Sequence, residues 1–234
     1  MSSQIHEGSR LLDGRPDGLL VGFDIAGIQP HSFVQVAHVD MTVVESPVTL
    51  VEYFSTGADN YPIVYIHDVD NLRYLFGDVA RIYAESSNAI RGFPVEDTAA
   101  ILIRFNSGVM GTVITSDVVA SPYNFESATG ENPFYYRAAQ DCYRIFGTEA
   151  SLNFPEMTLW RYTGEGEQGW EDPISSEQID VEPGVPLKKE LRNFCDVIRN
   201  DAMPRCPGEE GLKTLEATMA VAEAVRRCKP VTFD

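Results

Sequence analysis

The chain has 234 residues and a formal charge of −17, from 35 Asp and Glu against 18 Lys and Arg. Hydrophobic residues make up 44% and charged residues 23%, a mix that is typical of folded globular proteins and excludes disordered, collagen-like and low-complexity chains. An acidic surface repels phosphate backbones and anionic lipids, so we expect no nucleic-acid partner and no membrane partner.

The cysteines and the apolar runs bear on location and on metal binding. The four cysteines are widely spaced, with no Cys-x-x-Cys pair, so we expect reduced thiols and no metal site. No apolar run approaches the ~18 residues that a membrane span needs. A cytoplasmic location is the expectation that follows.

Two regions are expected along the chain. Residues 1–60 form a leader of short strands separated by Gly and Pro, which can belong to the same domain as the rest. Within it, 34–44 and 48–54 are the best strand candidates, because they are rich in β-branched and aromatic residues. Residues 61–234 carry sharper signals and are expected to form the main domain.

The main domain begins with a strand that leads into a helix. A short apolar run at 63–66 predicts a buried strand or strand end. The helical spacing of Val69, Leu72 and Phe76 then predicts a helix, with Gly77 placed where a C-terminal cap belongs. Strands are predicted at 79–85, 98–105, 109–117, 143–146, 151–154 and 158–162.

The connections between these elements predict the fold class. Residues 106–108 have the composition of a hairpin turn, and the acidic segment 161–185 is expected to be a solvated loop. Helices are predicted at 187–198 and 210–227, with a short last strand at 231–233. This order predicts an α+β fold with an open, predominantly antiparallel sheet and helices packed on one face.

One glycine pattern resembles a cofactor motif. Residues 164–169 spell Gly-x-Gly-x-x-Gly, which binds a dinucleotide only between a strand and a helix. Here Glu165 and Glu167 would repel the phosphates, and Trp-Glu-Asp-Pro follows the last glycine. An acidic loop is the better interpretation, so no cofactor-binding residue is assigned.

His67 is the most informative residue. It directly follows a predicted buried strand, with Tyr65 before it and Asp68 and Asp70 after it. This position suits a general acid or base whose tautomer or charge a carboxylate could hold, and we take His67, Tyr65 and Asp70 as catalytic candidates. The alternative is an ordinary helix start, at which His67 or Asp68 caps the backbone.

Two polar, aromatic stretches are candidates for a small-ligand pocket. One includes Arg91, and the other runs from Glu126 through Asn132 to Tyr136. Long loops that leave a sheet often carry binding residues, so we expect these four residues to bind substrate. In the alternative interpretation they satisfy turn amides and cover the sheet.

Several short motifs, taken in order, resemble one known family. They lie at 66–77, 95–99, 105–111, 146–152, 191–199 with Pro204, and 210–212. Together they resemble the C-terminal domain of the Gfo/Idh/MocA oxidoreductases, the glucose-fructose oxidoreductase and inositol dehydrogenase family. The resemblance implies an open sheet that carries the substrate pocket and commonly the dimer interface. It also implies an N-terminal Rossmann domain that binds NAD(P), of which this sequence shows neither the glycine fingerprint nor Glu-Lys-Pro.

The resemblance assigns His67 to the catalytic histidine of the family. The family often has Asp four residues before this histidine and Gly two before it, where this chain has Ile63 and Tyr65. We therefore expect no hydride-transfer role to carry over with His67, and no cofactor unless a partner supplies the Rossmann domain with NAD or NADP.

Three functions follow as hypotheses. The first is a cofactor-independent isomerase, lyase or cyclase that uses acid/base chemistry on a small oxygenated molecule. The second is a truncated or split NAD(P)-dependent oxidoreductase that needs a separate nucleotide-binding partner. The third is a non-catalytic dimeric binding protein. In each, a small molecule is the ligand, and a homodimer through the sheet is expected.

Overall fold

The computed structural model describes residues 33–39, 65–164, 169, 171–182 and 184–233. The strand expected at 48–54, the end of the one expected at 34–44, and Ile63 lie outside the described residues. The described part of the chain divides into two compact units, one at 182–211 and the other formed by the remaining residues.

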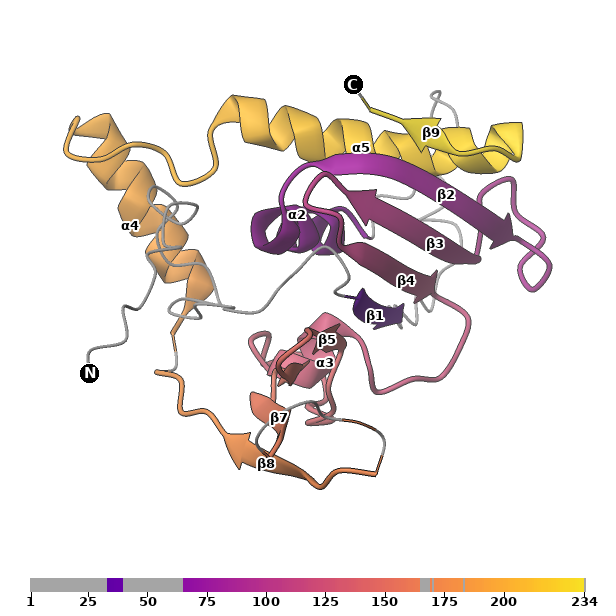
Figure 1. Ribbon diagram of the computed structural model, residues 1–234. Coiled ribbons are helices and arrows are strands. Elements are labelled where there is room, and N and C mark those ends of the chain that lie inside the picture. Colours follow the sequence, from indigo (N-terminus) through magenta and orange to yellow (C-terminus); the bar gives the residue numbers. More distant parts are fainter. Residues whose placement is uncertain (1–32, 40–64, 165–168, 170, 183, 234) are drawn as a thin grey trace. The chain divides into compact units, whose positions relative to one another are not determined.

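The larger unit is built on one open sheet (Figure 1). Its order is β8-β7-β6-β5-β1-β4-β3-β2-β9, and neighbouring strands are antiparallel except β1 and β4. The strands are β1 (Phe33–Val39), β2 (Val79–Ser87), β3 (Thr98–Phe105), β4 (Met110–Ser116), β5 (Tyr143–Phe146), β6 (Ser151–Phe154), β7 (Thr158–Tyr162), β8 (Ile174–Gln178) and β9 (Val231–Thr232). The predicted α+β class with a predominantly antiparallel sheet is confirmed.

Helices α2 (Ile66–Phe76) and α5 (Gly208–Arg227) cover one face of this sheet (Figure 1). Alternation along β3 buries Ile101, Ile103 and Phe105 toward the helices. The rings of Phe76 and Phe105 lie 5.5 Å apart between centroids, so α2 packs directly on the strand. The other helices are α3 (Phe125–Thr129) and, in the smaller unit, α4 (Pro186–Ile198).

The hairpin between β3 and β4 forms as predicted. The backbone N–H of Gly108 donates to the carbonyl of Phe105 at 2.9 Å, and Phe105 donates to Val109 at 3.0 Å. Gly108 has φ of 89°, a left-handed conformation that glycine adopts without strain.

The prediction of a solvated loop at 161–185 was wrong in part, because β8 lies within it and pairs with β7. Every residue of β8 is exposed, as on an edge strand with both faces in solvent. Such a strand lacks the alternation of apolar and polar residues from which strands are predicted.

A chain of polar contacts joins α2, α5 and the start of β2. The buried Arg73 guanidinium donates to Thr214 Oγ1 at 2.6 Å and to Asp78 Oδ1 at 2.8 Å. Lys213 Nζ donates to Asp78 Oδ2 at 3.0 Å. Thr214 Oγ1 in turn donates to Asp70 Oδ1 at 2.6 Å. These contacts fix how α2 and α5 lie on each other.

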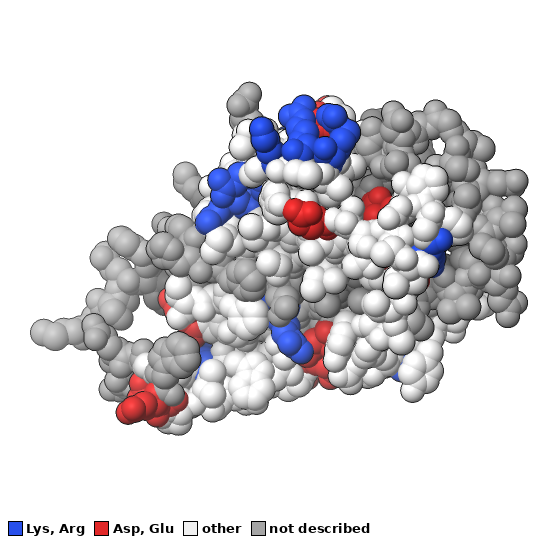
Figure 2. Space-filling model, turned by 90° about the vertical axis from the view of Figure 1, so that its right-hand side faces the viewer, with Lys and Arg blue, Asp and Glu red and all other residues white. Residues whose placement is uncertain are grey.

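The C-terminal end of α5 is basic. Arg226 and Arg227 lie in its last turn, where positive charge complements the helix dipole. Arg226 Nη2 lies 2.6 Å from Glu223 Oε1. In Figure 2, Lys and Arg side chains gather at the top of the view, toward this end of α5. Within the described ranges, no helix combines the length and the apolar character that crossing a membrane requires.

The contacts of Asp78 predict a pH dependence of stability. Hydrogen bonds from Arg73 and Lys213 lower the pKa of Asp78 below its ordinary value. Because the pKa is lower in the folded state, the ionised carboxylate stabilises the fold at pH values above the unfolded-state pKa of about 3.9. This stabilisation is lost as the pH falls through the folded-state pKa. Asp78→Asn should therefore lower the free energy of unfolding at pH 7 by roughly 0.5–1 kcal/mol, because Asp78 is partly exposed.

Urea unfolding at pH 7 and at pH 3 measures this effect, and the difference in stability between Asp78→Asn and the wild type should be smaller at the lower pH. Glu223→Gln is the matched control, since it removes a carboxylate whose pKa is also lowered but that pairs on the helix surface. An equal loss of stability from Asp78→Asn at both pH values would show that the carboxylate charge is not the stabilising feature.

Candidate functional site

His67 lies in the first turn of α2, and its side chain is exposed. Tyr65 occupies the N-cap position of α2, and its own side chain makes no capping hydrogen bond. His67 is free to meet a ligand from solvent.

Asp68, the residue after His67, belongs to a buried hydrogen-bond network that joins α2 to β5. The Tyr143 hydroxyl donates to Asp68 Oδ1, and Asn71 Nδ2 donates to the Tyr143 oxygen at 3.1 Å. Burial, and then the nearby Asp68 carboxylate, raise the pKa of Tyr143 well above its ordinary value, so this phenol stays neutral and remains a donor. The network holds the first turn of α2 against the sheet.

An aromatic cluster supports Tyr143. Its ring centroid lies 5.5 Å from that of Phe154 on β6 and 6.1 Å from that of Phe125, the first residue of α3. The Asn124 side chain accepts a hydrogen bond from Ser127 N at 2.8 Å and so caps α3. The segment that carries α3 is thereby packed on the same network that supports the start of α2.

The other two catalytic candidates, Tyr65 and Asp70, are less exposed than His67. Tyr65 is fully buried, and among the described residues its hydroxyl has no hydrogen-bond partner. Burial, with a smaller contribution from Glu96, raises the pKa of Tyr65, so it does not ionise near neutral pH. Asp70 is half-buried and accepts a hydrogen bond from Thr214. This hydrogen bond links α2 to α5.

Arg91 joins two loops in the structure. Its Nη1 lies 2.6 Å from Asp117 Oδ2, and its Nη2 donates to the Asp117 carbonyl at 2.9 Å. The backbone N–H groups of Ile90 and Arg91 donate to Asp97 Oδ2 at 2.9 and 3.0 Å. The Arg91 charge is therefore engaged in holding the connection between β2 and β3 against the end of β4.

The remaining predicted binding residues lie on or after α3. Glu126 is half-buried in the first turn of that helix. Asn132 Oδ1 accepts from Phe134 N at 3.1 Å and forms a turn, and Tyr136 projects into solvent with 85% of its surface exposed. These residues lie along one loop, but no described contact joins their side chains into a single site.

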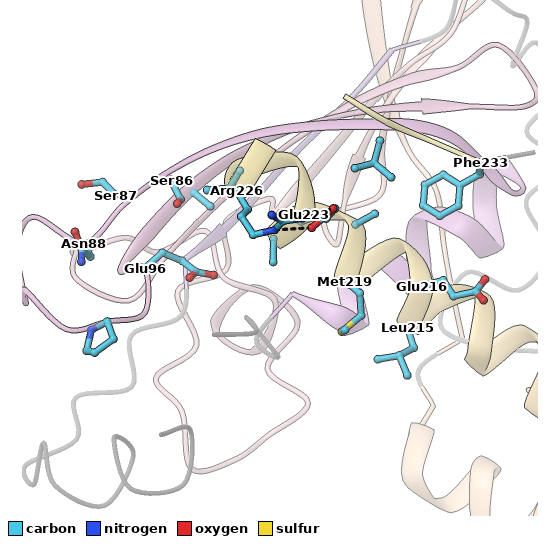
Figure 3. Close-up of a pocket in the computed structure, with 17 residues that line it drawn as sticks. Ser86, Ser87, Asn88, Glu96, Leu215, Glu216, Met219, Glu223, Arg226 and Phe233 are labelled. Atoms are coloured by element: carbon cyan, nitrogen blue, oxygen red, sulfur yellow. Dashed lines mark hydrogen bonds and ion pairs between the residues drawn. The ribbon is translucent and has the colours of Figure 1, made fainter. Parts of the chain in front are cut away.

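A hollow of about 950 Å³ lies between α5, β9 and the end of β2 (Figure 3). Leu215 and Met219 of α5 and Phe233 form its apolar part, while Ser86 and Glu96 lie toward its polar end. Burial, and then Asp117, raise the pKa of Glu96 above its ordinary value. His67 is not among the residues that line this hollow.

Sequence reasoning missed the roles of Tyr143 and Asn71, and it considered Asp68 as a neighbour of His67 or as a helix cap but not as a partner of Tyr143. Tyr143 is 75 residues from Asp68 in sequence, so no local spacing could have joined them. A tyrosine in a short strand with buried alternate residues was the available signal. Within the described ranges, no group of three or more His, Cys, Asp or Glu side chains could hold a metal ion.

The glycine pattern at 164–169 lacks the surroundings of a dinucleotide site. The glycine pattern connects β7 to β8, two antiparallel strands, and Glu165–Gln168 lie outside the described residues. Gly169 N donates to Asp172 Oδ2 at 2.6 Å, so a carboxylate already occupies the position of an anion. No strand-to-helix cradle for phosphates exists here.

Known proteins with similar sequences and folds are dehydrogenases and oxidoreductases. The D-apiose dehydrogenase of Paraburkholderia graminis is 25% identical over 174 residues, which cover 71% of this chain and 42% of that protein. The chain thus spans less than half the length of this curated relative.

Solved structures share the fold. The aldose-aldose oxidoreductase from Caulobacter crescentus, in a complex with glycerol, matches with a TM-score of 0.60 and 17% identity, over 89% of this chain and 56% of that one. The UDP-N-acetylglucosamine 3-dehydrogenase GnnA from Acidithiobacillus ferrooxidans matches with a TM-score of 0.58 and 22% identity, over 86% of this chain and 56% of that one.

These relatives overturn our first functional hypothesis. A cofactor-independent isomerase, lyase or cyclase was expected, but the related proteins are named dehydrogenases and oxidoreductases. The family model for the C-terminal alpha/beta domain of the oxidoreductase family matches residues 62–233, most of the chain. This match covers the start of α2 with His67, the whole of the sheet after β1, and both α4 and α5. The chain therefore belongs to the Gfo/Idh/MocA oxidoreductase family, through its C-terminal domain.

Proposed function

We propose that this chain supplies the substrate-binding and proton-transferring part of an NAD(P)-dependent oxidoreductase that acts on a hydroxyl-bearing carbon of a sugar-like molecule. Family membership and the names of the relatives support the redox class. The names D-apiose dehydrogenase and aldose-aldose oxidoreductase support the substrate class. A nucleotide-binding domain outside residues 62–233 is the partner that this function requires.

The observation that carries the proposal is an exposed His67 on a rigidly held helix start. The imidazole is accessible to a ligand, while Asp68, the next residue, is hydrogen-bonded to Tyr143 beneath it. Oxidation of an alcohol requires removal of the hydroxyl proton, and a neutral imidazole is suited to accept it near pH 7. NAD(P), held by the separate domain, supplies the redox chemistry.

The first prediction concerns His67 itself. In a mixture of the chain, NAD+, sugar substrates including D-apiose and the nucleotide-binding domain of the P. graminis enzyme, His67→Ala should lower kcat by about 10²–10⁴-fold. The melting temperature should not change, because the imidazole is exposed. NADH absorbance measures the rate, and added imidazole should restore part of it. An unchanged kcat in His67→Ala would refute the role of His67.

A second prediction concerns the network under His67. Tyr143→Phe removes the donor to Asp68 and leaves a buried carboxylate less well satisfied, so the free energy of unfolding should fall by about 1–3 kcal/mol. As Tyr143 positions α2, kcat should fall about tenfold, with KM nearly unchanged.

Tyr162→Phe, the same change at a half-buried position of β7, is the matched control and should leave both quantities unchanged. If Tyr143→Phe lowered stability but left kcat at the wild-type value, the network would be structural alone.

We also propose that two copies of the chain associate through the face of the sheet away from the helices. Leu102 on β3 and Ile114 on β4 lie on the sheet face opposite the buried side chains, and both are close to half exposed. Tyr83 is paired with Leu102, while Arg81 and Glu85 lie two residues to either side of Tyr83 on β2. A two-fold axis across the strands at Leu102 would place the arginine end of one copy over the glutamate end of the other.

This association predicts the effect of a charge at its centre. Leu102→Arg should convert a dimer into a monomer, as measured by light scattering after size exclusion. Val119→Arg introduces the same charge at an exposed apolar residue that is not on a strand, and it should leave the mass unchanged. A wild-type chain that is monomeric at about 100 μM would contradict the proposal.

A further inference from the structure

The hollow between α5, β9 and the end of β2 plays no part in the proposed function (Figure 3). Its volume of about 950 Å³ lies within the range of small-molecule sites, roughly 300–1,000 Å³. The residues that line it all belong to the larger unit, so the hollow does not depend on how the two units are placed. It is therefore a candidate for a ligand other than the substrate at His67.

One side of the hollow is apolar. Leu215 and Met219 lie on successive turns of α5, with 46% and 36% of their surfaces exposed. Both side chains extend from the same side of the helix in Figure 3. The apolar part of a ligand that packed against them would remove these side chains from water, which favours binding.

Glu96 lies at the polar end of the hollow. Its side chain is half-buried and extends toward α5 in Figure 3. Burial, and then Asp117, raise the pKa of Glu96, and among the described residues no Lys or Arg lowers it. The folded chain therefore holds the ionised carboxylate less favourably than water does. A carboxylate held at such a cost in a hollow is typical of a functional site.

Tyr65 adds a second polar group near Glu96. The Tyr65 hydroxyl is fully buried and has no hydrogen-bond partner within the described ranges. Glu96 contributes to the raised pKa of this phenol, so the two groups lie near each other. A buried polar group without a partner is costly, which leaves this end of the hollow incompletely satisfied without a ligand.

The charges around the hollow select the sign of that ligand. Its ionisable lining residues are three carboxylates, Glu96, Glu216 and Glu223, and one guanidinium, Arg226. Arg226 Nη2 lies 2.6 Å from Glu223 Oε1, so this cation is paired within the helix. The remaining charge is negative, which attracts a cation and repels an anion.

We infer that the hollow binds a small organic cation, with an ammonium head beside Glu96 and an apolar body along Leu215 and Met219. The inference goes beyond the proposed function and does not rest on it, because it requires neither NAD(P) nor His67.

The test follows methionine methyl groups by NMR during a titration of the full chain. The probe is 4-phenylbutylamine, a cation at pH 7.5, and 4-phenylbutanol and 4-phenylbutyrate carry the same apolar body on a neutral and an anionic head. The resonance of Met219, assigned from Met219→Leu, should shift saturably, while those of Met157 and Met203, which do not line the hollow, should not. The amine should bind with Kd of about 0.1–5 mM, at least about tenfold more tightly than the carboxylate.

Substitution of Glu96 tests the head group. Glu96→Gln should weaken binding of the amine by about fivefold and leave the affinity for the alcohol within about twofold. Glu156→Gln removes the same charge from an exposed residue between β6 and β7, and it should leave both affinities within about twofold. Because the pKa of Glu96 is raised, Glu96→Gln should melt at or above the wild-type temperature at pH 7.5, so misfolding would not explain weaker binding.

Four outcomes would overturn the inference. They are no saturable shift of Met219 at about 20 mM amine, equal affinity for amine and carboxylate, unchanged amine affinity in Glu96→Gln, and equal shifts of all the methionine resonances. The titration contains neither cofactor nor sugar, so none of these results would bear on the proposed function.

Discussion

The hydrogen bond from Tyr143 to Asp68 is the contact on which the arrangement of the site depends. A carboxylate buried beneath a helix is costly unless a donor satisfies it, and the donor here comes from a strand 75 residues away. The sheet and α2 must therefore pack in an arrangement that brings the Tyr143 hydroxyl to the Asp68 side chain. His67, the residue before Asp68, is held at the surface as a consequence.

The other end of α2 is held by a second set of polar contacts. Arg73 bridges Thr214 and Asp78, and Asp70 accepts from Thr214, so the helix is fixed to α5 as well as to the sheet. A group that transfers a proton gains from such rigid support, because misplacement by a fraction of an ångström lowers the rate. Burial raises the pKa of the Tyr65 and Tyr143 phenols and keeps them neutral, while the His67 side chain beside them in sequence is exposed.

Local sequence patterns were sufficient to predict much of the fold. They did not predict which strands pair when those strands lie far apart in sequence. The hairpin at 106–108, the helix predicted from the spacing of Val69, Leu72 and Phe76, and the strand at 98–105 depend on signals within a few residues. Each was predicted correctly. The pairing of β1 with both β4 and β5 joins segments that lie far apart in sequence, and β8 has no buried face, so neither carried a local signal.

The functional prediction failed for a related reason. Missing cofactor motifs led to a non-redox hypothesis, although the chemistry of an enzyme can be divided between domains. In the proposed function the described domain supplies the substrate side.

The most direct test of the redox account follows a deuterium label. A sugar substrate deuterated at the carbon that bears the reacting hydroxyl is incubated with the chain, the nucleotide-binding domain of the P. graminis enzyme and NAD+, and the cofactor is analysed by mass spectrometry. The account predicts deuterium in the reduced cofactor, at a rate that falls with His67→Ala. Conversion of the sugar with the label retained in the product or lost to solvent, and with the cofactor unchanged, would contradict it.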